Sequence, residues 1–355
     1  MGIFENMLKS GESIFVNELA LDFSFQPKLL LHREKEQFTI ANAIRPLFAE
    51  RTGKNIMLYG KPGIGKTLAV LHVFKELEDQ HEEILPVYIN CWQNNSTYKI
   101  AIALCEAVNY KFYQNKKTHE IFKDLQETFN KTTVAFCFDE VDKLEDFDFL
   151  YTLIEGVYKK TIILISNYKE WFTSLDERIR SRLRPELLEF REYSPNEIND
   201  ILGQRKSFAF KQGVLEEDAF AEILRHTVEQ RDIRAGLHLM RQAAEAAEET
   251  SSRIIGKQHV QDVLQKGAEA YTKEPIELDE ECRIILEIVK ANNGQKIGDI
   301  FKKYEDTGGK QSYKTFSRKV QTLAFGSFVT LKKIGGAGGN STLVYYQMIK
   351  RLNEF

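Results

Sequence analysis

The chain has few of the residues that would make it a disulfide-stabilised, metal-clustering or membrane-spanning protein. Its 355 residues include only four cysteines, which lie far apart in apolar contexts and form no C-x-x-C pair: Cys91, Cys105, Cys137 and Cys282. This spacing indicates neither a disulfide framework nor a zinc site, and buried reduced thiols are the expected alternative. The stretch MGIFENMLKSGESIF lacks the apolar core of a signal peptide, and the longest apolar runs have only strand length. A cytoplasmic protein with no membrane partner is therefore expected.

The net charge is also small, because 49 basic and 52 acidic residues leave a formal charge of only -3. The balance is uneven along the chain. From residue 310 to residue 333 there is no aspartate or glutamate, and the cations of this segment are Lys310, Lys314, Arg318, Lys319, Lys332 and Lys333. Local charge of one sign indicates a polyanionic partner, with a solvated face as the alternative. The length suits two or three domains, because single cores stop growing beyond about 250 residues.

A glycine-rich loop of the type that cradles phosphates follows the strand-like run NIMLY. Its sequence GKPGIGKT fits the pattern G-x-x-x-x-G-K-[ST] and leads into the helical pattern LAVLHVFKELE. In such a loop the backbone N–H groups close around phosphates, the lysine reaches the β- and γ-phosphates and the threonine binds Mg²⁺. The alternative is a glycine turn between a strand and a helix. The residues predicted to contact ATP or ADP are Gly60, Lys61, Pro62, Gly63, Ile64, Gly65, Lys66, Thr67 and Leu68.

Acidic and amide side chains follow two further strand-like runs. The continuously apolar run from Val134 to Phe138 ends in Asp139 and Glu140. We expect Asp139, together with Thr67, to hold Mg²⁺ beside the nucleotide, and Glu140 to orient or deprotonate the attacking water. The run TIILIS ends in Asn167, which is placed to bridge this water or the γ-phosphate. The alternatives are that Asp139 and Glu140 are two solvated acids and that Asn167 caps the helix that follows it.

Arginines crowd a short helical stretch, SLDERIRSRLRPELLEF, just before another strand-like run. Arg178 and Arg182 are four residues apart and therefore share one helical face. An arginine presented at a subunit edge stabilises charge on a neighbour's γ-phosphate, so we expect Arg182, with Arg178 second, to act on another subunit. A basic solvated helix is the alternative.

The order of these elements resembles that of an AAA+ ATPase, and further stretches resemble replication initiators of the archaeal origin-recognition and cell-division-control type. HREKE, at residues 32 to 36, is similar to the segment that begins the nucleotide pocket of those initiators, which implies that Arg33 contacts the nucleotide. FDEVDKLEDFDFLYTLIE is close to their Walker B stretch. RDIRAGLHLMRQAAEAAEE is similar to their sensor-2 helix, in which Arg234 matches the arginine that contacts ATP from the lid. One departure is Arg231, where the motif usually has a glycine, a residue more tolerant of unusual backbone angles.

The resemblance implies an α/β fold with three domains. These are an AAA+ nucleotide-binding domain with a parallel sheet at residues 1–192, an all-helical lid at residues 193–272 and a winged-helix domain at residues 277–355. The sequence pattern agrees, because it is helical from Ser194 to about Ala270 and then reads as a linker in YTKEPIE.

The last segment has the pattern of a winged helix, which consists of three helices followed by a β-hairpin. Its third helix, SYKTFSRKVQTLAF, has Phe316, Val320 and Leu323 on the side that we expect to face the core. Many winged helices bind proteins instead of DNA, but the absence of acids in this region favours DNA. The residues predicted to bind DNA lie on the opposite face of this helix and in the wing: Lys314, Arg318, Gln321, Lys332, Lys333, Gly336 and Gly338.

The resemblance implies an ATP-gated initiator that acts at the nucleoid, with double-stranded origin DNA, the replicative helicase and other initiator subunits as partners. It also implies a second DNA-contacting region within Trp92 to Lys117, for which a solvated loop is the alternative. Three other interpretations stay open. They are a clamp-loader-like motor that acts on protein rings, a regulatory ATPase that uses its winged helix for packing, and an initiator paralogue that hydrolyses ATP poorly. Arg234 argues against the regulatory ATPase.

The loop assignment makes a direct prediction for Lys66. Replacing this lysine with alanine removes the cation that reaches the β- and γ-phosphates, so Lys66→Ala is expected to abolish ATP binding while leaving basal DNA affinity mostly in place. Titration of ATP into the parent chain and the variant measures the difference. Equal ATP affinities would contradict the assignment of the phosphate site.

Overall fold

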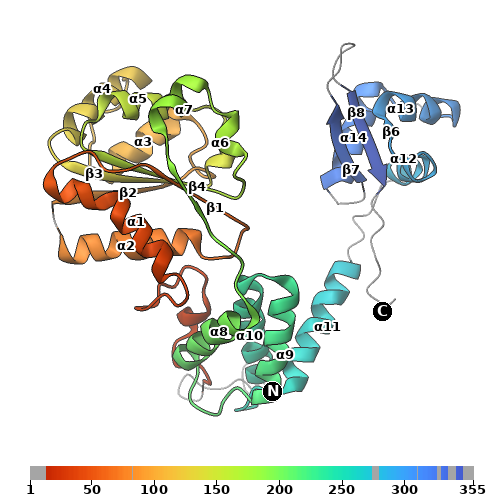
Figure 1. Ribbon diagram of the computed structural model, residues 1–355. Coiled ribbons are helices and arrows are strands. Elements are labelled where there is room, and N and C mark those ends of the chain that lie inside the picture. Colours follow the sequence, from red (N-terminus) through yellow and green to blue (C-terminus); the bar gives the residue numbers. More distant parts are fainter. Residues whose placement is uncertain are drawn as a thin grey trace. The chain divides into compact units, whose positions relative to one another are not determined.

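The computed structural model describes residues 13–81, 83–273, 280–309, 311–325, 329–334 and 341–346. The chain divides into two compact units, Met1–Leu264 and Gln265–Phe355, which are described separately below (Figure 1). All four cysteines are buried thiols, as the sequence predicts. Among the helices in the described ranges, none has the length and apolar character needed to cross a bilayer.

The first unit is built on a five-stranded sheet in which every recorded strand pairing is parallel. The strand order is β2-β3-β4-β1-β5. Every residue of β3 and β4 is buried, which explains why both strands read as continuous apolar runs in the sequence. The strand bounds are β1 Ile56–Tyr59, β2 Ile84–Asn90, β3 Thr133–Asp139, β4 Lys160–Ser166 and β5 Glu186–Glu189.

Helices cover both faces of this sheet, and each face has its own apolar core (Figure 1). Alternate residues of β3 serve the two cores, since Phe136 and Phe138 pack on one face and Ala135 and Cys137 on the other. The elements of the first face are α3 (Thr97–Ala107), α4 (Thr118–Phe129), η3 (Val141–Lys143), α5 (Asp148–Gly156), α6 (Trp171–Ser174) and α7 (Glu177–Leu183). Those of the second face are α1 (Glu34–Ile44), η2 (Arg45–Ala49) and α2 (Lys66–Gln80).

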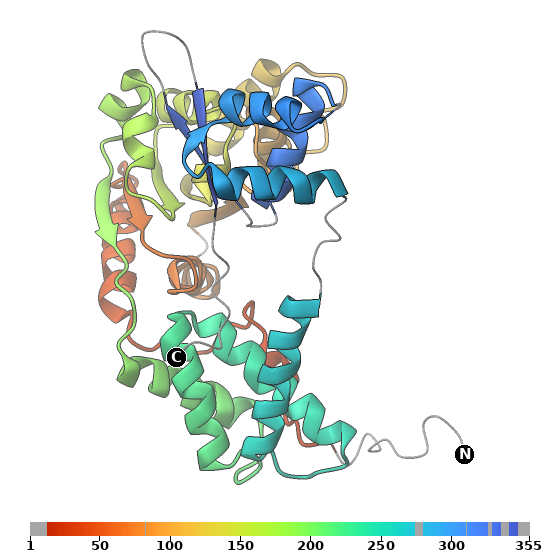
Figure 2. The same cartoon turned by 90° about the vertical axis from the view of Figure 1, so that its right-hand side faces the viewer.

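The rest of the first unit is helical and has a separate core, seen as a bundle in Figures 1 and 2. Its helices are α8 (Pro195–Ala209), α9 (Glu217–Gln230), α10 (Ile233–Glu249) and α11 (Lys257–Lys273), the last of which runs on into the second unit. The predicted Ser194 cap is present: its hydroxyl accepts from the Glu197 N–H at 3.4 Å, and Pro195 is the first helical residue. The helical lid expected from the sequence is therefore confirmed.

A segment near the start of the chain packs into this helical bundle, which the sequence did not predict. Ala20 and Leu21, in the short helix η1 (Glu18–Leu21), are buried in the bundle core. The buried Arg205 of α8 donates hydrogen bonds to the carbonyl oxygens of Ala20 (3.1 Å) and Phe25 (3.0 Å). Leu30 already belongs to a sheet core, so the chain passes from bundle to sheet before the first long helix.

Among its described residues after α11, the second unit has three helices and a small antiparallel sheet of order β6-β8-β7. Phe316, Val320 and Leu323 are fully buried, as expected for the inward side of the third helix. The two-residue strand β6 was not predicted. The elements are α12 (Glu280–Ala291), β6 (Gln295–Lys296), α13 (Ile297–Asp306), α14 (Tyr313–Phe325), β7 (Val329–Ile334) and β8 (Ser341–Tyr346), which follow the order that the winged-helix prediction requires. The residue boundaries of the three predicted domains stay predictions.

Candidate nucleotide-binding site

The sheet brings the predicted nucleotide residues to one edge. Strand β4 lies between β3 and β1 and is parallel to both, so the carboxyl ends of the three strands are adjacent. The glycine-rich loop follows β1, Asp139 ends β3, and Asn167 follows β4. Ligands bind outside the carboxyl ends of strands in open parallel sheets, so this edge is where the three motifs are expected to act together.

The loop has the backbone conformation that its glycines permit. Gly63 and Gly65 have φ values of 78° and 88°, in the left-handed region. A side chain at Gly63 would collide with Asp232 of the helical bundle, because an added Cβ would lie 2.2 Å from Oδ1 of that residue. The loop ends at the N-terminus of α2, where unpaired backbone N–H groups favour an anion.

Lys66 lies buried beneath the loop. Its Nζ donates hydrogen bonds to the carbonyl oxygens of Gly60 (2.7 Å) and Lys61 (2.8 Å) and to Oδ1 of Asn167 (3.0 Å). Burial lowers the pKa of Lys66 to about 8, against the attraction of Asp139. All three acceptors are neutral, so a phosphate in the loop would supply the counter-charge that this ammonium group lacks.

Asp139 accepts three hydrogen bonds and is almost completely buried. Its Oδ2 accepts from the hydroxyl groups of Thr67 (2.6 Å) and Tyr88 (2.9 Å), and its Oδ1 accepts from the Glu140 N–H (2.8 Å). The Thr67 hydroxyl and the Asp139 carboxylate are oxygen ligands of the kind that Mg²⁺ prefers, next to the place where phosphates would lie, so the residues fit this metal. In that role they would hold the ion, which neutralises phosphate charge.

Tyr88, in β2, was not predicted to take part in the site. Burial and the charge of Asp139 raise the pKa of its phenol, so the group keeps its proton and acts as a donor. Sequence reasoning missed this tyrosine because β2 precedes the acidic strand with no motif of its own.

Glu140 is half-buried at the turn that follows β3, with a left-handed φ of 54°. Burial, with the negative charges of Asp139 and Asp142, raises the pKa of its carboxyl group. A carboxylate of raised pKa next to the metal ligand can accept a proton from water, which is the role predicted for this residue.

Arg33 is fully buried behind the loop, between the rings of Phe190 and Tyr193 at 5.2 and 3.9 Å. Its five N–H donors are all directed at protein oxygens: the carbonyl oxygens of Ile64, Arg191 and His32 and the carboxylate of Glu36. The structure thus uses Arg33 to hold Ile64 and the loop in place, and its predicted contact with the nucleotide stays a prediction.

The helical bundle presents Asp232 and Arg234 to the loop. The Asp232 carboxylate caps α10 by accepting from the Arg234 N–H at 2.9 Å. The positive charge of Arg234 contributes to the lowered pKa of Lys66 and opposes the raised pKa of Glu140, so the three groups interact electrostatically. The structure therefore brings the predicted lid arginine to the nucleotide residues.

Arg231 takes the left-handed conformation that a glycine at this position would adopt most easily, with φ 55° and ψ 29°. This costs about 1–2 kcal/mol for a residue with a side chain. Its guanidinium pairs with the Glu192 carboxylate at 3.0 Å, and Glu192 also pairs with Lys61 of the loop. An arginine at this position thus keeps the backbone turn and adds an ion-pair link between α9 and the loop.

Arg178 and Arg182 lie on the exposed face of α7. Their recorded ion pairs are with Asp176 (3.1 Å) and Glu155, not with residues of the loop. Their predicted action on a neighbouring subunit stays a prediction.

In the second unit, Lys314, Arg318 and Gln321 are exposed on α14, opposite its buried face. Lys332 is exposed on β7, and Lys333 belongs to the same strand. Gly336 and Gly338 lie outside the described residues. The four described cations and Gln321 therefore belong to two neighbouring elements of one small domain, α14 and β7.

Comparison with known proteins places these observations in a family. Residues 49–168 match the AAA domain, and residues 199–265 match the Cdc6 AAA+ ATPase-type lid domain. The chain is 30% identical to ORC1-type DNA replication protein 3 of Haloarcula marismortui over 321 residues, which cover 85% of each chain.

Two solved structures have the same fold. The Aeropyrum pernix ORC1 protein in complex with DNA has a TM-score of 0.73 and 23% identity, covering 96% of this chain and 94% of that one. The Aeropyrum pernix ORC2 protein in ADPNP-ADP complexes has a TM-score of 0.64 and 18% identity, covering 94% of each chain.

The contact between Tyr88 and Asp139 predicts that Tyr88→Phe weakens Mg²⁺ binding. The phenylalanine keeps the ring and removes one donor that orients the carboxylate, so the apparent affinity of the ATP complex for Mg²⁺ should fall about 10-fold. ATP binding, titrated at a series of Mg²⁺ concentrations, measures the loss.

Binding of metal-free ATP should be unchanged in this variant, and Tyr158→Phe, at an exposed tyrosine of the same domain, should match the parent. An unaltered Mg²⁺ dependence in Tyr88→Phe would show that the hydroxyl serves packing alone.

Proposed function

This chain belongs to the family of archaeal ORC1-type DNA replication proteins, and on that basis we propose that it is an ATP-dependent initiator that binds duplex DNA at a replication origin and helps to load the replicative helicase. The observation that carries the proposal is that the predicted nucleotide residues lie at one edge of the sheet in a chain whose second unit has an exposed cationic helix. The protein would act in the cytoplasm, at the nucleoid.

In the proposed nucleotide site, Lys66 and the glycine-rich loop bind ATP or ADP, and Thr67 and Asp139 hold Mg²⁺. Glu140 and Asn167 position the attacking water. Arg234 senses the nucleotide from the lid, since its charge already acts on Lys66 and Glu140. A structural neighbour in ADPNP and ADP complexes supports the choice of nucleotide.

We expect slow, switch-like hydrolysis because the arginines proposed for the γ-phosphate, Arg178 and Arg182, would act on a neighbouring subunit. The ion pairs of Arg178 and Arg182 join them to acids of their own domain, on an exposed face. A neighbouring initiator subunit would therefore have to supply an arginine of this kind to the γ-phosphate. Assembly, instead of nucleotide binding alone, would then set the rate of hydrolysis.

The DNA part of the proposal rests on α14. Its buried side chains fix the helix on the small domain, while Lys314, Arg318 and Gln321 face outward at a spacing of four and three residues. Lys332 and Lys333 on β7 would contact the phosphate backbone, and we propose the same for Gly336 and Gly338. The DNA complex of a protein with the same fold supports this assignment.

We predict that Lys314→Ala/Arg318→Ala loses the selection of particular duplexes that the parent chain shows in a library of short DNAs. Affinity for all duplexes should fall at least about tenfold at physiological salt, and the slope of log affinity against log salt should become shallower by about 0.9 for each phosphate that the variant no longer neutralises. Binding is measured with ATP and with ADP at one fixed salt concentration, and the slope is then taken from a salt series.

The matched control is Lys296→Ala/Lys302→Ala, which removes two exposed lysines from the same small domain. If both double variants and the parent bind weakly and alike, the second unit contacts proteins instead of DNA.

A further inference from the structure

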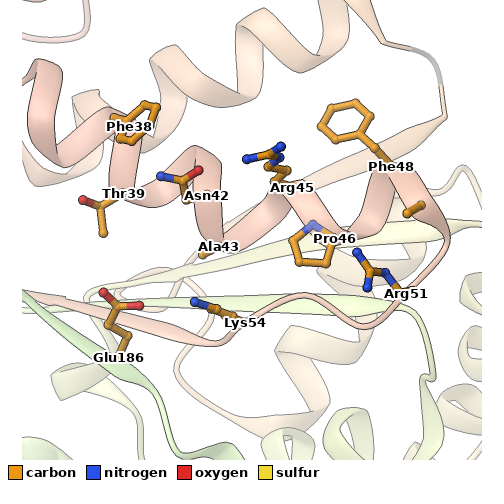
Figure 3. Close-up of a pocket in the computed structure, with 11 residues that line it drawn as sticks. Phe38, Thr39, Asn42, Ala43, Arg45, Pro46, Phe48, Arg51, Lys54 and Glu186 are labelled. Carbon is orange, nitrogen blue, oxygen red and sulfur yellow. The ribbon is translucent and has the colours of Figure 1, made fainter.

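A pocket of about 960 Å³ lies on the α1 side of the sheet and belongs to no part of the nucleotide site (Figure 3). Lys54 of its lining precedes β1, and Glu186 begins β5, so the pocket is at the amino ends of these strands. The nucleotide residues are at the carboxyl ends. Figure 3 shows Phe38, Thr39 and Asn42 projecting from α1 at one side of the pocket.

Two phenylalanines of this surface are exposed. Phe38 is 68% exposed and Phe48 is 42% exposed, and the Phe48 ring makes an edge contact with the His81 ring at 4.8 Å between centroids. Both phenylalanines also line a second, adjacent hollow of about 410 Å³ between α1 and α2. The two hollows share these two phenylalanines, and we call them together the Phe38–Phe48 groove.

Three cations and one acid line the larger part of the groove, so its side chains carry a net positive charge. Arg45, Arg51 and Lys54 are all exposed. Within the ranges that the structure describes, no side-chain hydrogen bond or ion pair is recorded for any of them. Glu186 is the one acid that lines this part of the groove. The cations therefore support no internal contact, and an anionic ligand is the partner that complements them.

The smaller part of the groove has the opposite charge. Glu34 and Glu76 line it together with His72 and His81. Duplex or single-stranded nucleic acid carries a negative charge every few ångströms and would meet these carboxylates as it crosses the phenyl rings. A polypeptide can carry different side chains opposite the cations, the phenyl rings and the acids of the groove. Exposed aromatic residues together with arginine are typical of protein interfaces.

We propose that the Phe38–Phe48 groove binds a segment of a partner protein in which acidic residues lie on one side of an aromatic or aliphatic anchor. The anchor packs between the two phenyl rings, and the acidic residues pair with Arg45, Arg51 and Lys54. Binding here leaves the nucleotide edge of the sheet available for its own ligand, because the groove lies at the opposite ends of the strands. The groove would thus recruit a protein without competing with ATP.

The test is a selection of random short peptides displayed on phage against the full chain, with counter-selection against Arg45→Glu/Lys54→Glu. Enriched peptides are expected to contain an acid next to an aromatic or aliphatic residue. A fluorescent copy of the enriched peptide should bind at least about tenfold more weakly to the double variant and to Phe38→Ala. Lys131→Glu, at an exposed lysine elsewhere on the same domain, should bind like the parent.

The altered side chains are exposed, and unchanged thermal unfolding and ATP binding would show that each variant is folded. Two results would overturn the proposal. One is that no peptide is enriched on the parent over the double variant. The other is that a single-stranded or duplex oligonucleotide, and no peptide, loses affinity in the groove variants, which would make the groove a nucleic-acid contact.

Discussion

The nucleotide site depends on one buried carboxylate, that of Asp139. It accepts hydrogen bonds from Thr67, Tyr88 and the Glu140 N–H, and so joins the first turn of α2, strand β2 and the turn after β3. A buried carboxylate is tolerated only when it is paired or fully hydrogen-bonded, which makes these contacts mutually dependent. Moving any one of the three elements would remove a donor from this charge, so we expect the predicted metal ligands to keep their geometry before the nucleotide arrives.

Charged side chains connect the helical lid to the glycine-rich loop. Asp232 lies against Gly63, while Glu192 pairs with both Lys61 and Arg231. These pairs are exposed and are individually weak. They nevertheless lie where phosphates would enter, so an anionic nucleotide would repel Asp232 and attract Lys61 and Arg234. Nucleotide binding therefore has a direct electrostatic route to the lid.

The sheet, the lid and the core of α14 could be predicted because burial leaves a periodic signal, as in the uninterrupted run Val134–Phe138. The loop could be predicted because it matches a known motif, and Asn167 because it follows a strand-like apolar run. Tyr88 could not be predicted, since its contact with Asp139 depends on the pairing of β2 with β3, which the sequence alone does not reveal. Arg33 was assigned to the nucleotide by resemblance, whereas in the structure its donors hold Ile64 and its neighbours. The left-handed Arg231 shows that a missing glycine need not change a turn when strain of a few kcal/mol or less is accepted.

The central claim is that Lys66 is a buried cation whose counter-charge is the nucleotide's phosphate. Its pKa of about 8 without ligand must rise when phosphate binds, so ATP binding should take up a proton, and affinity should fall as the pH rises through 8. Calorimetric titration of ATP at pH 8, in buffers of different ionisation enthalpy, measures this directly. The account predicts uptake of about half a proton per ATP. ATP binding with no proton uptake at pH 8 in the parent chain would contradict it.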